Sequence, residues 1–141
     1  MAARRLDGRT ALITGSDSGI GAATAVEFAR GGADVVVHYL DDADGAEAAR
    51  RSVEAEGRRA LVVQGDVSDE RQVEATFDQA VEAFGTVDIL VNNAGVDASG
   101  SPVAELSTEV WEGAIRTNVY GYFFCCRRFA PSARRPAAAA R

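Results

Sequence analysis

Lysine is missing from this sequence of 141 residues, because all fifteen basic residues are arginine. No mechanism that needs a lysine amine can therefore operate within this chain alone. Long apolar runs are also missing, and no segment approaches the roughly 18 apolar residues that a membrane span needs. The basic N-terminus is followed by only a short apolar stretch, which is unlike a secretion signal. We therefore expect a cytoplasmic protein that has no membrane partner.

Cysteine and histidine are scarce. The two cysteines, Cys125 and Cys126, are adjacent, and a disulfide between them would be strained. We interpret both as small apolar residues of a reduced protein. The sole histidine, His38, is interpreted as a surface residue at the end of a strand, with a phosphate contact as the alternative. We assign no metal ligand to the chain.

Acidic residues are missing after Glu112. Residues 1–112 contain all 21 acidic residues and nine arginines, a net charge of −12, whereas residues 113–141 contain six arginines, a net charge of +6. The whole chain has a formal charge of −6, so we expect no nucleic-acid partner. Its length and its 47% hydrophobic residues fit one globular domain, predicted over residues 1–128. Two prolines and an alanine run predict a low-complexity tail over residues 129–141.

Short apolar runs alternate with longer stretches of helical periodicity. The runs are continuous rather than alternating, which is typical of strands buried on both faces of a parallel sheet. The alternation predicts right-handed βαβ units, and hence an α/β fold with a doubly wound parallel sheet of about four strands in the order 3-2-1-4. The four predicted strands are Thr10–Thr14, Ala33–Tyr39, Ala60–Gln64 and Val87–Val91.

Four helices are predicted around these strands. The first follows Gly21, and the third is expected to be capped by Ser68 and to end at Gly85. The fourth is expected to begin near Thr108 and to turn Asn118 inward. The expected inward positions, in chain order, are Ala22, Val26 and Ala29; Ala46, Ala49 and Val53; Val73, Phe77, Ala80, Val81 and Phe84; and Trp111, Ile115, Asn118 and Tyr122.

The sequence TGSDSGIG follows the first predicted strand and opens the first helix. Gly15 permits a tight turn, Gly19 lets backbone approach a ligand, and Gly21 lets the helix lie close to the sheet. The helix N-terminus then offers unpaired N–H groups to a pyrophosphate, and Ser16 and Ser18 can add hydroxyl donors. The turn lacks the Gly-Lys-Ser/Thr of a P-loop, so nucleoside triphosphate hydrolysis is not expected. A glycine-rich turn without a ligand is the alternative.

Polar residues also follow the third and fourth predicted strands, at the sheet edge where ligands bind in open α/β folds. Asp66 could accept from an adenine amino group while the N–H of Val67 reaches a ring nitrogen, or Asp66 could simply cap the next helix. Asn92–Gly95 allows close approach to a flat ligand and can also lock neighbouring strands. Asn118, taken by itself, is interpreted as a structural asparagine.

Together these residues resemble the short-chain dehydrogenase/reductase family. The resemblance rests on TGxxxGIG from Thr14, on Asp66-Val67, on the NNAG sequence at 92–95 and on TNV at 117–119, and it covers roughly residues 6–128. It implies the N-terminal half of a Rossmann fold that binds NAD or NADP, and hydride transfer between alcohols and carbonyls. By this resemblance the pyrophosphate would be contacted by Gly15, Ser16, Ser18, Gly19, Ile20 and Gly21. Asp66 and Val67 would contact the adenine, and Asn93, Ala94 and Gly95 would lie along the ribose and nicotinamide. Asn118 matches the family's catalytic asparagine, which helps hold a water.

The family pattern also contains a serine and a Tyr-x-x-x-Lys motif, and neither occurs here in its place. The residues four positions after Tyr120 and Tyr122 are Phe124 and Cys126. We therefore expect a truncated and inactive family member. The alternative is a non-catalytic dinucleotide-binding fragment or interaction module. By resemblance, the helix that bears Asn118 would also form a dimer interface, so a homo-oligomer is expected.

The choice between NAD and NADP depends on the end of the second strand. Tyr39 stands at the position where an acid would favour NAD, and Leu40 and Asp41 follow it. No arginine is nearby to bind a 2′-phosphate, so we expect NAD. A small alcohol or carbonyl substrate is expected only for a completed enzyme, and nothing in the sequence names it.

Overall fold

The computed structural model describes residues 4–130 of the chain. Strands and helices alternate through its first two thirds, and helices alone make up the last third. The elements in chain order are β1 (Thr10–Ile13), α1 (Gly19–Arg30), β2 (Asp34–Tyr39), α2 (Ala43–Ala55), β3 (Ala60–Gln64), α3 (Glu70–Phe84), β4 (Ile89–Val91), a short 3-10 helix (Val103–Glu105), α4 (Thr108–Ile115), a π-helical turn (Arg116–Tyr120) and α5 (Gly121–Phe129).

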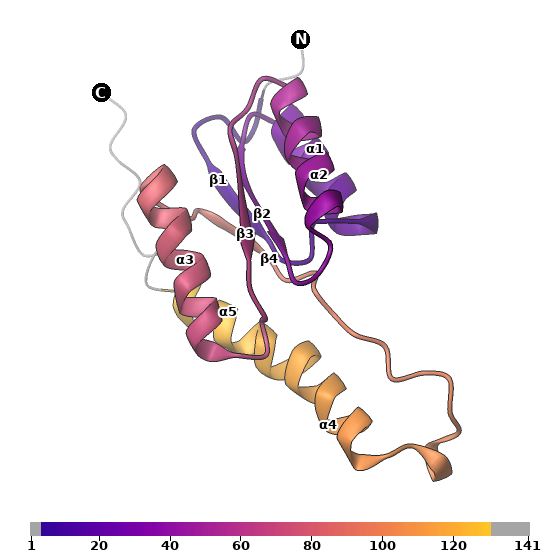
Figure 1. The fold of residues 1–141 in the computed structure, drawn as a ribbon. Coiled ribbons are helices and arrows are strands. Elements are labelled where there is room, and N and C mark those ends of the chain that lie inside the picture. Colours follow the sequence, from indigo (N-terminus) through magenta and orange to yellow (C-terminus); the bar gives the residue numbers. More distant parts are fainter. Residues whose placement is uncertain (1–3, 131–141) are drawn as a thin grey trace.

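The four strands form one parallel sheet in the order β3-β2-β1-β4. The predicted fold class and strand order are therefore confirmed. β1 lies in the middle, where Leu12 is in register with Val36 on one side and Leu90 on the other. Helices α1 and α2 cover one face of the sheet, and α3 and α5 cover the other (Figure 1).

Each face of the sheet has its own hydrophobic core. On the first face, alternate strand residues such as Ile13 and Val37 pack against the small side chains of α1 and α2. On the second face, Leu12, Val36 and Val63 pack against Phe77 of α3 and Phe124 of α5. Because β1 and β2 are buried on both faces, their sequences are continuous apolar runs.

The packing of the first and third helices differs in detail from the sequence prediction. In α1 the buried residues are Gly21, Ala25 and Ala29. The predicted inward positions Ala29 and, half-buried against the core, Ala22 are confirmed, whereas Val26 is half-buried outside the core and was wrong. The helix begins at Gly19, before Gly21, and Gly21 lies against the turn that follows β1. The cap of α3 is Asp69, whose carboxylate accepts from the N–H of Arg71, and not Ser68.

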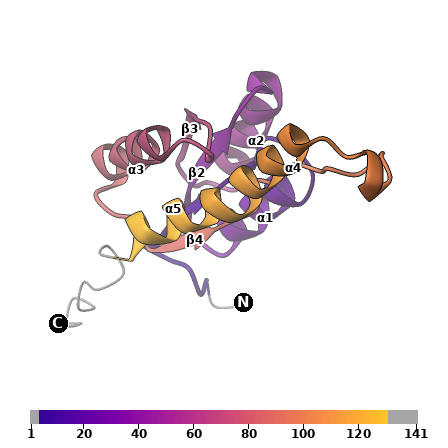
Figure 2. The ribbon, with the colours of Figure 1, turned by 90° about the horizontal axis from the view of Figure 1, so that it is seen from below.

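The last three helical segments run end to end as one rod beneath the sheet (Figure 2). The expected inward face of this rod was wrong, since Trp111, Asn118 and Tyr122 are exposed. The buried residues are instead Gly121, Phe124 and Cys125 of α5. Helix α4 buries no residue, and the rod reaches the core only at α5, where Gly121 lies close to Val67. A Cβ on Gly121 would lie 2.8 Å from a Val67 methyl, so only glycine allows this contact.

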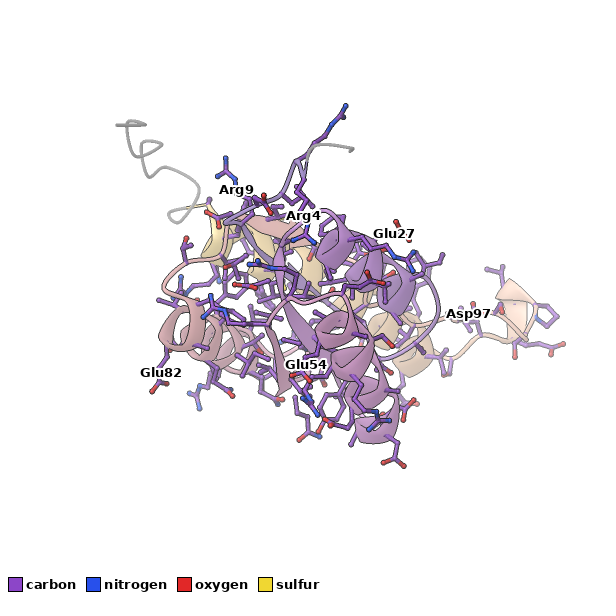
Figure 3. All side chains as sticks on the ribbon, turned by 90° about the horizontal axis from the view of Figure 1, so that it is seen from above. Arg4, Arg9, Glu27, Glu54, Glu82 and Asp97 are labelled. Carbon is purple, nitrogen blue, oxygen red and sulfur yellow. The ribbon has the colours of Figure 1, made fainter. Side chains whose placement is uncertain are left out.

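Most charged side chains lie on the outside of the molecule, and the labelled Glu82 points away from it (Figure 3). Asp34, in contrast, is buried and pairs with Arg58 and Arg59. Asp97 lies on the segment between β4 and α4, which projects from the body. No helix within residues 4–130 is long and apolar enough to cross a membrane. The predicted tail over 129–141 begins inside α5, where Phe129 packs against the core, and residues 131–141 lie outside the described part.

Candidate functional site

The glycine-rich turn after β1 is held in place by hydrogen bonds from several directions. Gly15 has a positive φ of +62°, which glycine adopts without strain. Its N–H donates to Nδ1 of His38 at 3.1 Å, and its carbonyl accepts from Nδ2 of Asn93 at 2.9 Å. Both polar backbone atoms of Gly15 are thus bound within the protein. Gly15 shapes the turn and does not offer its own N–H to a ligand.

Ser16 is also used within the protein. Its side chain is fully buried, and its hydroxyl donates to the carbonyl of Ile13 at 2.7 Å and accepts from the N–H of His38 at 3.1 Å. The expected hydroxyl contact of Ser16 with a phosphate is therefore wrong. Burial against the strand end leaves this hydroxyl facing away from solvent. Ser18, in contrast, is exposed at the N-terminus of α1 and makes no side-chain capping bond there.

The NNAG segment after β4 is fastened to the same turn through Thr14. The Thr14 hydroxyl accepts from the N–H groups of Asn93 and Ala94, each at 3.0 Å. The Asn93 side chain also donates to the carbonyl of Thr14 at 3.0 Å. These bonds lock two neighbouring strand ends together, as the sequence allowed. They also bring Ala94 against Gly15, where a Cβ would lie 3.0 Å from the Ala94 Cα.

A cavity of about 640 Å³ opens at the carboxyl edge of the sheet. This volume lies in the usual range for small-molecule and cofactor sites. Segments that are distant in the sequence meet there: the glycine turn, the loops after β2, β3 and β4, and the rod. The lining residues are Gly15, Asp17, Ser18, Gly19, Ile20, His38, Leu40, Asp41, Asp42, Gly65, Asp66, Val67, Asn93, Ala94, Gly95, Val96 and Thr117.

The N-terminus of α1 faces this cavity with backbone donors. The first intrahelical bond runs from the N–H of Ala22 to the carbonyl of Ser18, so the preceding N–H groups have no acceptor within the helix. Gly19 has a φ of +54°, and nothing lies within 4 Å of the position of a Cβ there. Open space beside unpaired donors fits an anionic group such as a diphosphate. Ile20 is 81% exposed at the same edge.

The loop after β2 lines the cavity with acidic residues. Tyr39, the residue at the position that was expected to decide between NAD and NADP, is half-buried against the core on the α1 side and is not among the residues that line the cavity. Asp41 and Asp42 line it instead. Asp42 also caps α2 by accepting from the N–H of Gly45 at 2.9 Å. Alternation along the strand explains this, because Tyr39 and His38 point to opposite faces.

Asp66 and Val67 lie where the sequence predicted, at the carboxyl end of β3. One carboxylate oxygen of Asp66 accepts from the N–H of Ser68 at 2.8 Å, which supports the local turn before α3. Val67 is 6% exposed and packs beneath α5. Both residues line the cavity, so the structural and the ligand-binding interpretations of Asp66 are compatible.

Asn118 lies in the π-helical turn, and its side chain is exposed. Its amide makes two bonds with the backbone of Val96, accepting from the N–H and donating to the carbonyl, each at 2.8 Å. Gly95 lies beside this pair, since a Cβ there would lie 3.2 Å from the Asn118 oxygen. Asn118 therefore ties the rod to the NNAG segment. Its neighbour Thr117, and not Asn118 itself, lines the cavity.

His38 is a cavity-lining residue that the sequence analysis placed wrongly. It is only 3% exposed, whereas we expected a surface position. The position of His38 directly after three valines, in a run typical of a strand buried on both faces, was the sequence signal that could have indicated its burial. The neighbours Asp17 and Gly65 were also not named, although each adjoins a predicted motif.

A sequence model of the short chain dehydrogenase family matches residues 9–139. The chain belongs to the short-chain dehydrogenase family. This result confirms the resemblance drawn from the four motifs. Several relatives of the chain are named as oxidoreductases or dehydrogenases, and its solved structural neighbours share the fold found here.

Individual relatives agree with this assignment. The 3beta-hydroxysteroid dehydrogenase 1 of Eggerthella lenta is 45% identical over 123 residues, which are 87% of this chain and 47% of that protein. The uncharacterized oxidoreductase YhdF of Bacillus subtilis is 42% identical over 127 residues, or 90% of this chain and 44% of that protein. The chain thus spans about half the length of the short-chain dehydrogenases that it matches.

A solved structure supports the cofactor class of the family. The crystal structure of a short chain dehydrogenase from Burkholderia cenocepacia in complex with NADP superimposes with a TM-score of 0.86 and 38% identity. The match covers 91% of this chain and 52% of that chain. The short-chain dehydrogenase fold is therefore one that holds a nicotinamide dinucleotide.

Proposed function

We propose that this chain binds a nicotinamide dinucleotide in the cavity at the carboxyl edge of its sheet. The observation that carries the proposal is the meeting of unpaired α1 donors with the Asp66 and NNAG segments around one cavity of about 640 Å³. The space beside Gly19 fits a diphosphate, since no atom lies where a side chain would be. In a complete family member, the same site would serve hydride transfer between an alcohol and a carbonyl.

Each part of the cavity suits a different part of the cofactor. The N–H groups at the start of α1, from Gly19 to Gly21, would hold the diphosphate. Asp66 and Val67 would hold the adenine, and Ala94 and Gly95 offer small residues along the ribose and nicotinamide. Asn93 contributes through the bonds that fix the turn, because its side-chain amide is committed to the carbonyls of Thr14 and Gly15.

Within this proposal, the cofactor is NAD rather than NADP. The cavity-lining residues contributed by the turn and by the loop after β2 include Asp17, Asp41 and Asp42, and no arginine is among the lining residues. A 2′-phosphate would bring further negative charge next to these carboxylates, and like charges at short range repel. The carboxylates can also accept from ribose hydroxyls, which only NAD presents in full.

The 141 residues supply binding groups but not the family's proton-transfer pair. When bound, the dinucleotide supplies hydride chemistry, and the family uses a tyrosine with a nearby lysine to move the proton. No lysine occurs in the sequence. We therefore propose that the chain by itself binds the dinucleotide without turnover, which is the non-catalytic alternative. Asn118 would belong to the reaction only in a completed enzyme.

Titration with NADH, followed by nucleotide fluorescence, tests the proposal. We expect saturable binding by the purified chain, tighter for NADH than for NADPH, and no oxidation or reduction with simple alcohols and ketones. Gly19→Ala should weaken NADH binding by about tenfold, because its methyl group adds backbone strain and enters the space beside the diphosphate donors. The matched control is Gly113→Ala, in α4 with nothing within 4 Å, which should bind normally. Equal affinity of all three proteins, or no binding at all, contradicts the proposal.

We also propose that the chain self-associates through the rod. Large apolar side chains are exposed along it, among them Trp111 at 54%, Val119 at 54% and Phe123 at 52%. Exposed apolar groups of this size along one helix are typical of an interaction surface. In sedimentation velocity, Phe123→Arg should shift the chain toward monomer, whereas Val103→Arg, on the projecting 3-10 helix, should not. A wild-type chain that stays monomeric at all concentrations would rule this surface out.

A further inference from the structure

His38 joins the two segments that we assign to the diphosphate and to the adenine. One ring nitrogen, Nδ1, accepts from the N–H of Gly15 at 3.1 Å. The other, Nε2, lies 2.8 Å from the carbonyl of Gly65, the residue before Asp66. The imidazole therefore bridges the glycine turn and the end of β3 while lining the cavity between them.

These two contacts define the protonation state of the ring. Because the N–H of Gly15 is a donor, Nδ1 must be an acceptor and carries no proton. Because the carbonyl of Gly65 is an acceptor, Nε2 must carry the proton. Only the neutral Nε2–H tautomer satisfies both neighbours, and a proton added at Nδ1 would face another N–H.

The surroundings favour the neutral ring. Burial lowers the pKa of His38 below its ordinary value, and this effect exceeds the opposing effects of the Gly65 carbonyl and of the carboxylates Asp17 and Asp66. On the α3 side the neighbouring group is the uncharged hydroxyl of Thr76, which donates to the carbonyl of Gln72.

The backbone of His38 adds to the constraint on the turn. Its carbonyl accepts from the N–H of Ser16 at 2.9 Å, and its own N–H donates to the Ser16 hydroxyl at 3.1 Å. Both bonds use backbone atoms of residue 38, so any residue other than proline could make them. The bond to the Gly15 N–H needs an acceptor on the side chain, and this is what the imidazole supplies.

We propose that His38 is a positioning residue of the dinucleotide site, whose neutral imidazole holds the glycine turn in its binding shape, so that proton uptake by the ring weakens dinucleotide binding. This inference rests on the proposed function, because it takes the turn as the diphosphate site. It assigns the sole histidine of the chain a role in affinity and in its dependence on pH.

Three variants separate this role from ordinary packing. His38→Asn keeps an acceptor at the δ position but cannot titrate, so it should preserve the bond to Gly15. His38→Leu removes the acceptor and keeps an apolar side chain. Val37→Ala, one residue earlier in β2, truncates a fully buried side chain on the opposite face of the sheet and serves as the control for lost stability.

The test is calorimetric titration with ADP-ribose between about pH 5.5 and pH 8, the range around the ordinary histidine pKa. ADP-ribose carries the diphosphate and the adenine but lacks the acid-sensitive reduced nicotinamide. The wild-type Kd should be constant above about pH 7 and should rise only as the pH falls through the lowered pKa of His38, by at most about tenfold per pH unit. Because acid also favours the unfolded chain, in which histidine binds a proton more readily, each reading is taken where circular dichroism shows a folded protein.

The three variants should differ both in their affinity at neutral pH and in how that affinity depends on pH. His38→Asn should bind within about threefold of wild type at neutral pH and lose the acid dependence, and His38→Leu should bind about tenfold more weakly at every pH, as expected when a buried N–H loses its acceptor. Val37→Ala should keep the wild-type profile. An acid dependence that persists in His38→Asn, or a His38→Leu protein that binds like wild type, would overturn the inference.

Nuclear magnetic resonance separates this inference from the proposed function. Since the chain has one histidine, its imidazole signals are unambiguous and should report the Nε2–H tautomer at neutral pH. The amide signal of Gly15 should move with the same acid midpoint as the ring. Failure to bind any nucleotide would count against the proposed function, whereas a Gly15 signal indifferent to imidazole titration would overturn the positioning role even if nucleotides bind.

Discussion

At Gly21 a single hydrogen atom in place of a side chain allows α1 to touch the turn that precedes it. A Cβ there would lie 2.4 Å from the carbonyl oxygen of Gly15 and 2.6 Å from Nδ2 of Asn93. Those two atoms form a hydrogen bond with each other. The absence of a side chain at Gly21 leaves room for this hydrogen bond, which joins the turn to the NNAG segment. Individual atoms at this edge of the sheet therefore decide whether the cavity can form.

Gly21→Ala should destabilise the fold by about 1–3 kcal/mol, because both contacts are far inside van der Waals distance and backbone must move. Urea unfolding followed by circular dichroism measures this change. Gly113→Ala is the matched control, expected to be neutral or to gain up to about 1 kcal/mol from helix propensity. Equal stabilities of the two variants would refute the packing role of Gly21.

Asp41→Arg should convert the cofactor preference toward NADP. The substitution replaces a cavity-lining carboxylate with a cation that can bind a 2′-phosphate, so the ratio of NADPH to NADH affinity should rise about tenfold. Asp44→Arg makes the same charge change on α2 at a residue outside the cavity lining and should leave the ratio unchanged. If both variants change the ratio equally, net charge and not position 41 sets the preference.

The position of a residue in the site was predictable from the sequence where local backbone geometry alone requires that residue type. Gly15, Gly19 and Gly21 follow from turn geometry and close approach, and Asp66 from its place after a strand. Ser16 and His38 were placed wrongly because they hydrogen-bond to each other across the ends of β1 and β2. Such pairings between β1 and β2 become visible only once the register of the sheet is known.

The rod contacts two different parts of the molecule, the hydrophobic core and the segment that follows β4. α5 buries Phe124 and Cys125 against the core, and burial raises the pKa of the Cys125 thiol to about 12, which keeps it protonated and unreactive. The π-helical turn before α5 carries Asn118 out toward Val96. A regular helical period predicted one inward stripe from Trp111 to Tyr122, and this failed because α4 buries no residue and only α5 packs against the core.

Asn118→Ala should release the segment after β4 from the rod. The variant loses both bonds to the Val96 backbone, about 1 kcal/mol in total at this exposed position, so the Val96 amide should exchange its hydrogen roughly fivefold faster. Ser107→Ala, which removes the cap of α4 and leaves Val96 untouched, should not accelerate that exchange. Unchanged exchange at Val96 in Asn118→Ala would show that the two bonds do not restrain the segment.

At the scale of the whole molecule, the architecture was predicted from the sequence more accurately than the side-chain contacts were. Continuous apolar runs and helical spacing determine the sheet and its layers, because βαβ units leave few alternatives. They do not determine which face of the rod is covered. Within residues 4–130, β4 pairs only with β1 and the rod exposes Trp111 and Phe123, so this side of the molecule has apolar surface to cover.

The central claim is that the dinucleotide binds where the α1 N-terminus, the end of β3 and the NNAG segment meet. Backbone amide shifts during NADH titration of the isotope-labelled chain test it most directly, since each segment reports separately. We predict saturable shifts confined to Ser18–Gly21, Leu40–Asp42, Asp66–Val67 and Asn93–Val96, all lining or adjoining the cavity. Shifts that appear elsewhere, or a spectrum that NADH leaves unchanged, would contradict the account.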